Sequence, residues 1–203
     1  MERHTLLKIF VAALLFLCAL PTQESFAEKE LLKTPADYEG PFYPVTSQDD
    51  IDSDLIHVKG MTGVARGDVM NLSGRIVNTS GEPQGGLIIE IWQTDPHGRY
   101  KHPDDSTPGE RDPNFQYWGA AVTGSDGSYS FKTIVPGAYY PRPAHIHYKV
   151  LRDNKLILTS QIYFTKPAEG ERPPSLTGQM KLQTVTLKPA ANGEFEAFFQ
   201  IVI

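Results

Sequence analysis

The stretch WGAAVTGSDGSYSFKTI, residues 118–134, decides the class of fold. It contains two short runs of residues that favour strands, 118–123 and 129–134. Between them stands Gly-Ser-Asp-Gly, a combination typical of a turn because Gly and Asp adopt the backbone angles that turns need. The stretch therefore predicts two strands joined by a short turn.

The same pattern continues on both sides of this stretch. Further strands are expected at 71–77, 87–94, 145–151, 156–164, 182–187 and 194–203. Within 87–94, Ile89, Ile91 and Gln93 share one face by the two-residue period, and Asp153-Asn154 is typical of a hairpin turn. No segment has a sustained helical period with caps. About eight short strands at this spacing predict one all-β domain, an antiparallel β-sandwich with an immunoglobulin- or transthyretin-like two-sheet core.

The segments before the first strand have a different composition. A short charged start leads into an apolar run at 9–20, which is too short for a membrane span of about 20 residues. Small residues at Ser25 and Ala27 complete a signal peptide at 1–27, so we expect export to the periplasm or the medium without a membrane anchor. Residues 28–69 predict an extended N-terminal arm, and residues 70–203 the sandwich.

Composition excludes several kinds of chemistry. The 203 residues include 19 Lys and Arg against 24 Asp and Glu, a formal net charge of −5, without a basic cluster. This balance argues against a nucleic-acid partner, which requires cations to neutralise phosphates. The single cysteine, Cys18, lies in the expected signal peptide. The mature protein would therefore have neither disulfides nor thiol ligands, and its chemistry must come from oxygen and nitrogen groups.

The segment AYYPRPAHIH, residues 138–147, holds the most informative polar residues. In a strand, His145 and His147 point to the same face, where two imidazoles can bind one metal ion. Arg142 places a fixed cation beside them, which suits an anionic ligand. Tyr139 or Tyr140 could return toward the histidines from the proline-containing turn.

A further phenol comes from Tyr100 in Gly98-Arg-Tyr100, just after the expected strand at 87–94. Tyrosine has an ordinary pKa near 10, so it becomes a metal ligand at neutral pH only beside a strong Lewis acid such as ferric iron. The residues alone therefore indicate a metal site of imidazole and phenol groups.

Eight motifs in order relate the chain to a known family. They are Gly40-Pro-Phe-Tyr-Pro44, Gly81-x-Pro-x-x-Gly86, Ile91-Trp-Gln-Thr-Asp95, Gly98-Arg-Tyr100, Gly127-x-Tyr-x-Phe-x-Thr-Ile134, Pro136-Gly-x-Tyr139, Arg142-Pro-x-His-Ile-His147 and Ser160-Gln-Ile-Tyr-Phe164. Together they closely resemble the intradiol ring-cleavage dioxygenases, the protocatechuate and catechol dioxygenase family. Only three positions separate Tyr139 from Arg142, which resembles a short-loop, often secreted branch.

The resemblance implies a non-haem Fe(III) cofactor and a catechol-type substrate that reacts with O2 to give a muconate-type diacid. By the same resemblance the metal ligands are Tyr100, Tyr139, His145 and His147, with Tyr140 as a rival to Tyr139. Tyr139 also acts in catalysis, because the substrate displaces it and the freed phenolate takes a proton. Arg142 stabilises negative charge that develops on the substrate, and Gln161 orients the substrate by hydrogen bonding.

Two other classes of function compete with this reading. One is a non-catalytic binding sandwich of the transthyretin or immunoglobulin type, which has no need of these ligands together. The other is a His-x-His jelly-roll enzyme with zinc or manganese. Against it, this chain has no further histidine after His147.

The remaining candidates receive simpler interpretations. Solvated loop positions are expected for His97 and His102, and core or rim positions for Trp92 and Trp118. Cations that could face a ring carboxylate are Arg99, Lys101 and Arg111. The sequence leaves open which catechol is used, and whether the arm wraps its own sandwich or a second copy in a homo-oligomer.

Overall fold

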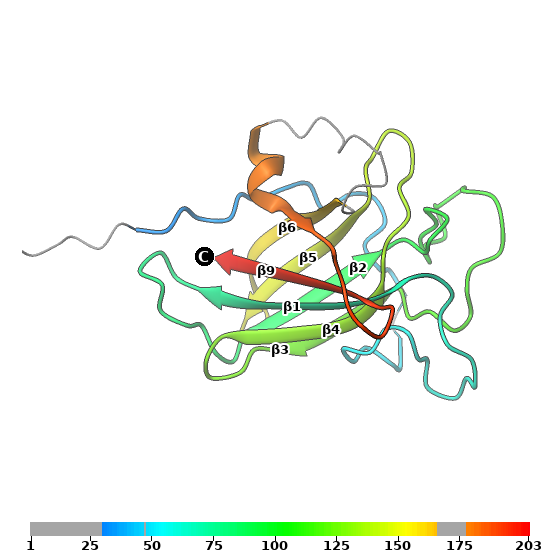
Figure 1. Cartoon of the computed structure of the whole chain (residues 1–203), viewed down its shortest axis with the longest axis horizontal. Coiled ribbons are helices and arrows are strands. Elements are labelled where there is room, and N and C mark those ends of the chain that lie inside the picture. Colours follow the sequence, from blue (N-terminus) through cyan, green and yellow to red (C-terminus); the bar gives the residue numbers. More distant parts are fainter. Residues whose placement is uncertain (1–29, 47, 166–177) are drawn as a thin grey trace, which may run out of the picture.

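A computed structural model describes residues 30–46, 48–165 and 178–203. Two facing β-sheets form the body of the protein (Figure 1). One sheet has the strand order β4-β1-β9-β8 and the other β3-β2-β5-β6-β7. The strands are β1 (Val69–Val77), β2 (Ile88–Gln93), β3 (Trp118–Val122), β4 (Ser128–Ile134), β5 (His145–Arg152), β6 (Lys155–Thr165), β7 (Thr184–Thr186), β8 (Lys188–Pro189) and β9 (Phe195–Val202). The expected all-β sandwich is confirmed. The expected signal peptide, 1–27, lies outside the described residues.

Strand direction differs from the expectation at two places. Strands β1 and β9 are parallel, and so are β6 and β7, so both sheets are mixed rather than purely antiparallel. The two-residue burial period is the same for either direction, so the sequence pattern could not distinguish them. The turn at 124–127 joins β3 and β4, which lie in different sheets, and so carries the chain from one layer to the other.

The C-terminal part contains the largest departure from the expected strands. The expected strand at 182–187 begins instead within a short 3-10 helix, η1 (Gly178–Gln183), and only β7 remains extended. The two-residue strand β8 was not anticipated. The other expected strands lie within two residues of their observed bounds, and Asp153 and Asn154 have the positive φ angles of the expected hairpin turn.

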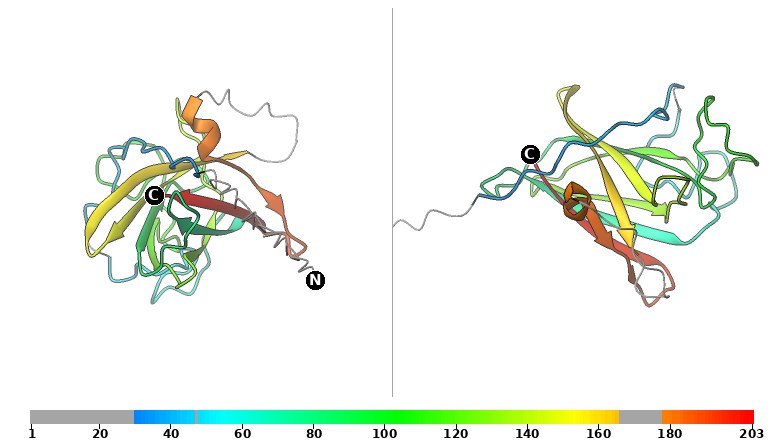
Figure 2. Two further views of the ribbon diagram at one scale, coloured as in Figure 1. Left: turned by 90° about the vertical axis from the view of Figure 1, so that its left-hand side faces the viewer. Right: turned by 90° about the horizontal axis from the view of Figure 1, so that it is seen from above.

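Figure 2 shows the two sheets from two further sides. Alternating side chains of both sheets fill the space between them. Ile89 and Ile91 are completely buried, as their shared face predicts. Gln93 is also buried, and its amide is satisfied because Nε2 donates to the Ile134 carbonyl at 2.9 Å and Oε1 accepts from the Thr133 hydroxyl at 2.8 Å. The buried Gln93 side chain therefore has a partner for both its donor and its acceptor group.

The N-terminal arm is attached to the sandwich by backbone hydrogen bonds. The Thr34 amide donates to the Val202 carbonyl at 2.9 Å, and the Asp37 amide donates to the Thr159 carbonyl at 3.0 Å. Farther along, Leu55 and Ile56 are buried in the same core as the strands. Residues 37–43 thereby pass over the outer side of β5 and β6, where the expected site residues lie. The division at residue 70 stays a prediction.

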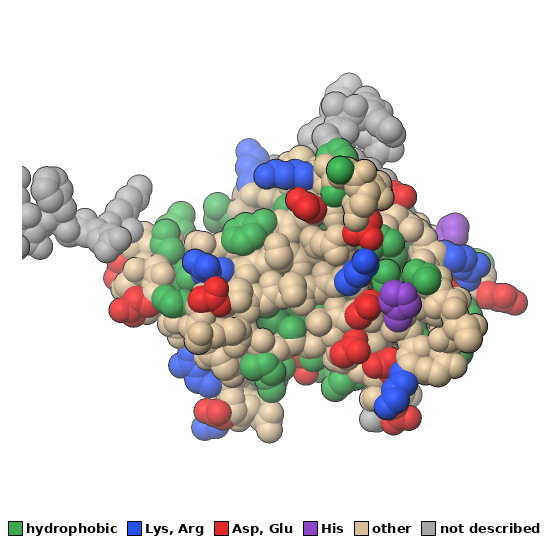
Figure 3. Space-filling view, turned by 60° about the horizontal axis from the view of Figure 1, so that its bottom comes forward, with side chains coloured by type: hydrophobic (Ala, Val, Ile, Leu, Met, Phe, Trp, Pro, Cys, Tyr) green, Lys and Arg blue, Asp and Glu red, His purple; other side chains and the backbone are tan. Residues whose placement is uncertain are grey.

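The outer surface is mixed in character. On the face drawn in Figure 3, acidic and basic side chains alternate with scattered hydrophobic ones. None of the helices in the described part of the chain has the length and hydrophobicity that crossing a lipid bilayer requires.

Candidate metal centre

Strand β5 carries the histidine pair on the face that points away from the sandwich core. Ile146 and Tyr148 enter the core, so the two-residue period turns His145 and His147 outward together. Their Nε2 atoms are 3.0 Å apart, and the residues are only 2% and 3% exposed. Because β5 lies between β2 and β6, both histidines are held by a strand paired on each side. Their burial comes from the arm and the loops that cover this face.

Tyr100 reaches the same point from the loop after β2. Its hydroxyl oxygen lies 3.1 Å from Nε2 of His147 and 3.4 Å from Nε2 of His145. The Tyr100 amide donates to Oδ2 of Asp105 at 2.6 Å, and Nε of Arg111 donates to the Tyr100 carbonyl at 3.0 Å. The loop is therefore braced at the ligand position itself.

The cations proposed for a ring carboxylate have other partners. Nε of Arg99 donates to Oδ2 of Asp95 at 2.8 Å in a buried ion pair, and Arg111 is bound to loop carbonyls. Nζ of Lys101 contacts the Gln48 side chain at 3.3 Å. Arg99 and Arg111 thus stabilise the loop that carries Tyr100.

The structure separates the two rival tyrosines. The Tyr139 ring lies 5.7 Å from the Tyr100 ring and 5.6 Å from the His145 ring, measured between centroids. The neighbouring Tyr140 side chain is 99% exposed. Backbone hydrogen bonds between Tyr139 and Arg142 close the turn that holds the inner tyrosine. The structure brings Tyr139 to the histidines and turns Tyr140 to solvent.

Electrostatics keep the imidazoles neutral. Burial lowers the pKa of His145 to about 4, and burial together with the nearby His145 and Arg142 lowers the pKa of His147 to about 2. Nδ1 of His145 is 2.6 Å from the Pro143 carbonyl, which can only accept, so Nδ1 carries the proton. The lone pair of Nε2 then faces His147 and Tyr100, as a metal ligand requires.

The tyrosines need a cation to ionise. Burial, and then the neighbouring Tyr139, raise the pKa of Tyr100 well above its ordinary value. A multiply charged ion at the donors reverses this effect, because it stabilises the phenolate directly. The chemistry of this donor set therefore calls for a strongly Lewis-acidic metal.

The spacing of the donors fits a metal ion. Two ligands that are each about 2.0–2.2 Å from one ion stand roughly 2.8–3.6 Å apart at angles between octahedral and tetrahedral. The observed separations are 3.0, 3.1 and 3.4 Å. Among the described residues, no three His, Cys, Asp or Glu side chains gather, so a metal at this point depends on the tyrosines. Nitrogen and hard oxygen donors without sulfur suit ferric iron.

A polar network lies beside the donors. Nη2 of Arg142 donates to Oε1 of Gln161 on β6, and to the Tyr163 hydroxyl oxygen at 3.1 Å. Nε of Arg142 is buried and has no hydrogen-bond partner among the described residues, which leaves one donor for a bound ligand. Burial, followed by Asp37, raises the pKa of Tyr163 above its ordinary value, so Tyr163 stays a neutral phenol.

Sequence reasoning assigned no role to Tyr163 or to Asp37. For Tyr163 a signal was available, because it stands two residues after Gln161 and so shares its strand face. For Asp37 there was none, since contacts between the arm and β6 are long-range and carry no local pattern.

Aromatic rings enclose the donors. The Trp92 ring stacks on His147 with centroids 4.9 Å apart and planes 9° from parallel, and Phe42 lies 5.0 Å from the Tyr100 ring. His102 is 8% exposed and packs 5.5 Å from Phe42, so the expectation of a solvated loop position is wrong for it. The arm supplies Phe42 and thereby covers the His102 side chain, which would otherwise face solvent. His97 is exposed, as expected.

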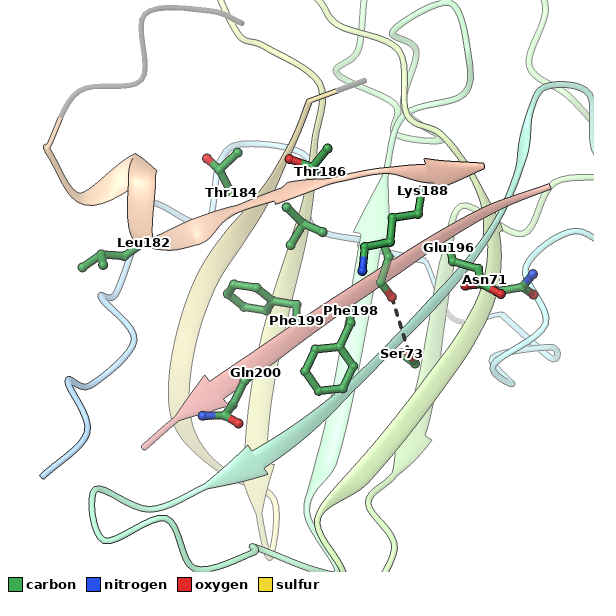
Figure 4. Close-up of a pocket in the computed structure, with 12 residues that line it drawn as sticks. Asn71, Ser73, Leu182, Thr184, Thr186, Lys188, Glu196, Phe198, Phe199 and Gln200 are labelled. Atoms are coloured by element: carbon green, nitrogen blue, oxygen red, sulfur yellow. Dashed lines mark hydrogen bonds between the residues drawn. The ribbon is translucent and has the colours of Figure 1, made fainter. Parts of the chain in front are cut away.

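A groove lies elsewhere on the molecule. It measures about 720 Å³ and lies beside β9, with Phe198 and Phe199 on that strand and Thr184, Thr186 and Lys188 on the segment that crosses it (Figure 4). None of the expected site residues lines it.

Comparisons with known proteins find similarity to dioxygenases. A family model described as Dioxygenase matches residues 38–170. The protocatechuate 3,4-dioxygenase beta chain of Burkholderia cepacia is 33% identical over 154 residues, which cover 71% of this chain and 63% of that protein. Catechol 1,2-dioxygenase 1 of Acinetobacter lwoffii is 29% identical over 157 residues, which cover 63% and 45%. The chain thus spans only part of the length of these curated relatives.

Two solved structures share the fold over nearly their whole length. The dioxygenase domain of a dioxygenase carbohydrate-binding protein fusion from Streptomyces sp. SirexAA-E has a TM-score of 0.65 at 27% identity, covering 84% of this chain and 97% of that one. An intradiol ring-cleavage dioxygenase from Tetranychus urticae has a TM-score of 0.66 at 23% identity, covering 85% and 95%.

Proposed function

The chain belongs to the intradiol ring-cleavage dioxygenase family, and on that premise we propose that it cleaves a catechol-type ring with O2. The ring opens between the two hydroxyl-bearing carbons, both oxygen atoms of O2 enter the product, and a muconate-type diacid is released. The observation that carries the proposal is the convergence of two neutral imidazoles and two phenols beside Arg142. A binding sandwich has no use for such a costly buried arrangement.

The proposed cofactor is Fe(III), with Tyr100, Tyr139, His145 and His147 as its ligands. When bound, ferric iron supplies a Lewis acid that accepts both catecholate oxygens and makes the ring reactive toward O2. The donor spacing and the neutral imidazoles support this choice.

The residues of the chain have separate roles in the proposed reaction. Tyr139, which the metal would hold as a phenolate, takes a proton from a catechol hydroxyl at its phenolic oxygen. It lies in the turn that its backbone bridge to Arg142 closes. Arg142 offers its free Nε donor to negative charge that develops on the ring, a fixed electrostatic contribution that needs no reorganisation. Gln161, held on β6, keeps the guanidinium of Arg142 in place and orients the substrate.

The covering residues exclude water from this chemistry. Gly40 is so close to the His147 ring that an added Cβ would stand 3.1 Å from Cε1, and Phe42 packs on Tyr100. A site closed in this way strengthens the charge interactions inside it. We also propose export of the mature protein, which rests on the sequence of residues 1–27 alone.

Oxygen-18 labelling tests the proposed reaction. Iron-loaded protein given catechol and labelled O2 should yield a ring-opened diacid with a label in each new carboxyl group, detected by mass spectrometry. An aldehyde product, from cleavage outside the hydroxyl pair, would contradict the proposal. The variant Arg142→Leu should retain its iron and colour but lose turnover, and full activity there would refute the role of Arg142.

A further inference from the structure

Asp37, in the N-terminal arm, is connected to Arg142 through one intervening side chain. Its Oδ2 atom lies 2.9 Å from the Tyr163 hydroxyl, which in turn lies 3.1 Å from Nη2 of Arg142. Three distant parts of the chain meet here: the arm, the strand β6 and the loop before β5. A carboxylate, a phenol and a guanidinium thus form one continuous chain of hydrogen bonds.

The chemistry of these groups fixes the direction of the bonds. A guanidinium only donates and a carboxylate only accepts, so the Tyr163 oxygen accepts from Arg142 and its one proton goes to Asp37. The Tyr163 hydroxyl also lies 2.8 Å from Oε1 of Gln161, but the charged acceptor forms the stronger bond. Nε2 of Gln161 donates to the Tyr38 carbonyl at 2.6 Å, which turns Oε1 toward Arg142. Nη2 of Arg142, Nε2 of Gln161 and the Tyr163 hydroxyl then each have an acceptor, whereas Nε of Arg142 has none among the described residues.

Resting on the function proposed above, we propose that Asp37 is a positioning residue for Arg142 and acts through Tyr163. Because Asp37 accepts the hydrogen bond of the Tyr163 hydroxyl, both the Tyr163 oxygen and Gln161 Oε1 are free to accept from the guanidinium. It also places a negative charge behind the phenol, which strengthens the bond from Arg142. Arg142 is thereby aimed at the site before a substrate arrives.

A purely structural role for Asp37 is the rival explanation. The backbone amide of Asp37 already donates to Thr159, and the Ser160 hydroxyl donates to the Pro35 carbonyl at 2.7 Å. These bonds fix the arm on β6 without the Asp37 side chain. Replacement of the carboxylate by an amide of the same shape should therefore leave the arm in place.

The substitution Asp37→Asn reverses the network. The new amide can donate to the Tyr163 oxygen and occupy the lone pair that Arg142 uses. The Tyr163 hydroxyl then donates to Oε1 of Gln161 instead. That oxygen, the second acceptor of Arg142, is no longer free for the guanidinium. We expect kcat to fall about tenfold, the usual effect of replacing a residue that orients a group at the site, with a smaller change in KM. Iron content and the visible spectrum should not change.

A double-mutant cycle distinguishes the two explanations. In a Tyr163→Phe background, Asp37→Asn should have no further effect on kcat, because the connecting hydroxyl is absent. Asp37→Glu should restore part of the activity. The matched control is Asp49→Asn, which removes an exposed carboxylate from the same arm and should behave as wild type.

Crystal structures of the metal-free variants give a readout independent of turnover. In Asp37→Asn the Arg142 guanidinium should leave Tyr163 while residues 37–43 stay on β6. The proposal is overturned if kcat is unchanged, if the effects of the two substitutions simply add, or if Asp37→Asn releases the arm or its iron. Failure of the proposed function itself would be seen in the wild type, as an iron-loaded protein that does not open a catechol ring.

Discussion

His147 is the residue on which most contacts of the site converge. Its Nε2 atom faces both His145 and Tyr100, Trp92 stacks on its ring, and Gly40 closes over its edge. A ring held on one face and at one edge cannot turn away when its partners change, so its lone pair stays directed at the proposed metal position. The packing of His147 therefore supports its proposed role as a ligand.

At this scale the substitution His147→Ala should abolish iron retention. One of four donors is lost, and the cavity left beside Trp92 loosens the remaining ones. Iron per protein, measured after gel filtration, should fall to background, while His97→Ala, which removes an exposed histidine from the neighbouring loop, should bind iron as the wild type does. Retention of iron by His147→Ala would refute the ligand set.

The two adjacent tyrosines offer a matched pair of variants. Tyr139→Phe removes a phenol beside the donors, so the intensity of the tyrosinate-to-iron charge-transfer band should fall and its position should shift. Tyr140→Phe removes an exposed phenol and should leave the absorption spectrum unchanged. If Tyr140→Phe alters the spectrum and Tyr139→Phe does not, the assignment of the second tyrosine is reversed.

Local sequence patterns predicted much of the site but not the residues that surround its donors. The spacing of His145 and His147 on one strand predicts that they point together, because alternation is a property of any extended chain. The choice between Tyr139 and Tyr140 needed the turn geometry, since neighbours in a loop have no fixed face. Asp37 became visible only when the arm was placed on β6.

Among the elements, the arm is the one that completes the site. Residues 37–43 bond to β6 through the backbone and cover the outward face of β5. Without this cover the His145 and His147 rings would lie on a solvent-facing side of the sheet. The conformation of the arm should therefore affect both the stability and the metal centre.

Gly40 tests that dependence. It has a φ of +77° and lies against the His147 ring, whereas Gly60 has a φ of +84° and nothing within 4 Å of an added Cβ. Alanine at either position costs about 1–2 kcal/mol for the left-handed backbone. Gly40→Ala should lower the free energy of unfolding in denaturant by more than Gly60→Ala does, and should also weaken iron binding. An equal loss of unfolding free energy in the two variants would show that packing of Gly40 on His147 does not contribute to stability.

The elements themselves were predicted with unequal success. Strands such as β2 and β5 alternate clearly and were placed within two residues, because one face enters the core. Strand β8 has only two residues, too few to show any period. The parallel direction of β9 beside β1 depends on how the chain returns from the other sheet, which no local pattern records.

For the whole molecule, the proposed metal donors and the hydrophobic core lie on opposite faces of the sheet that contains β5. Folding of the core therefore does not require the metal, because the buried histidines are neutral without it. Bound iron would nevertheless tie β5 to the loops that carry Tyr100 and Tyr139. A ligand that binds only the native state stabilises it, by about 4 kcal/mol at a thousandfold excess over Kd.

Iron removal should therefore lower stability without loss of the fold. After chelation and dialysis, the far-ultraviolet circular dichroism spectrum of the β-sandwich should persist while Tm decreases, and addition of Fe(III) should restore Tm. Unfolding on chelation would contradict the separation of core and site. An unchanged Tm would indicate that iron does not bind at these residues.

The visible absorption spectrum of the iron-loaded protein, recorded without O2 before and after addition of catechol, tests the central claim most directly. Two tyrosinates on ferric iron should give a red-brown charge-transfer band, and catechol should shift it because catecholate joins the iron and Tyr139 leaves. A colourless protein that holds iron, or a band that catechol does not move, would contradict the account.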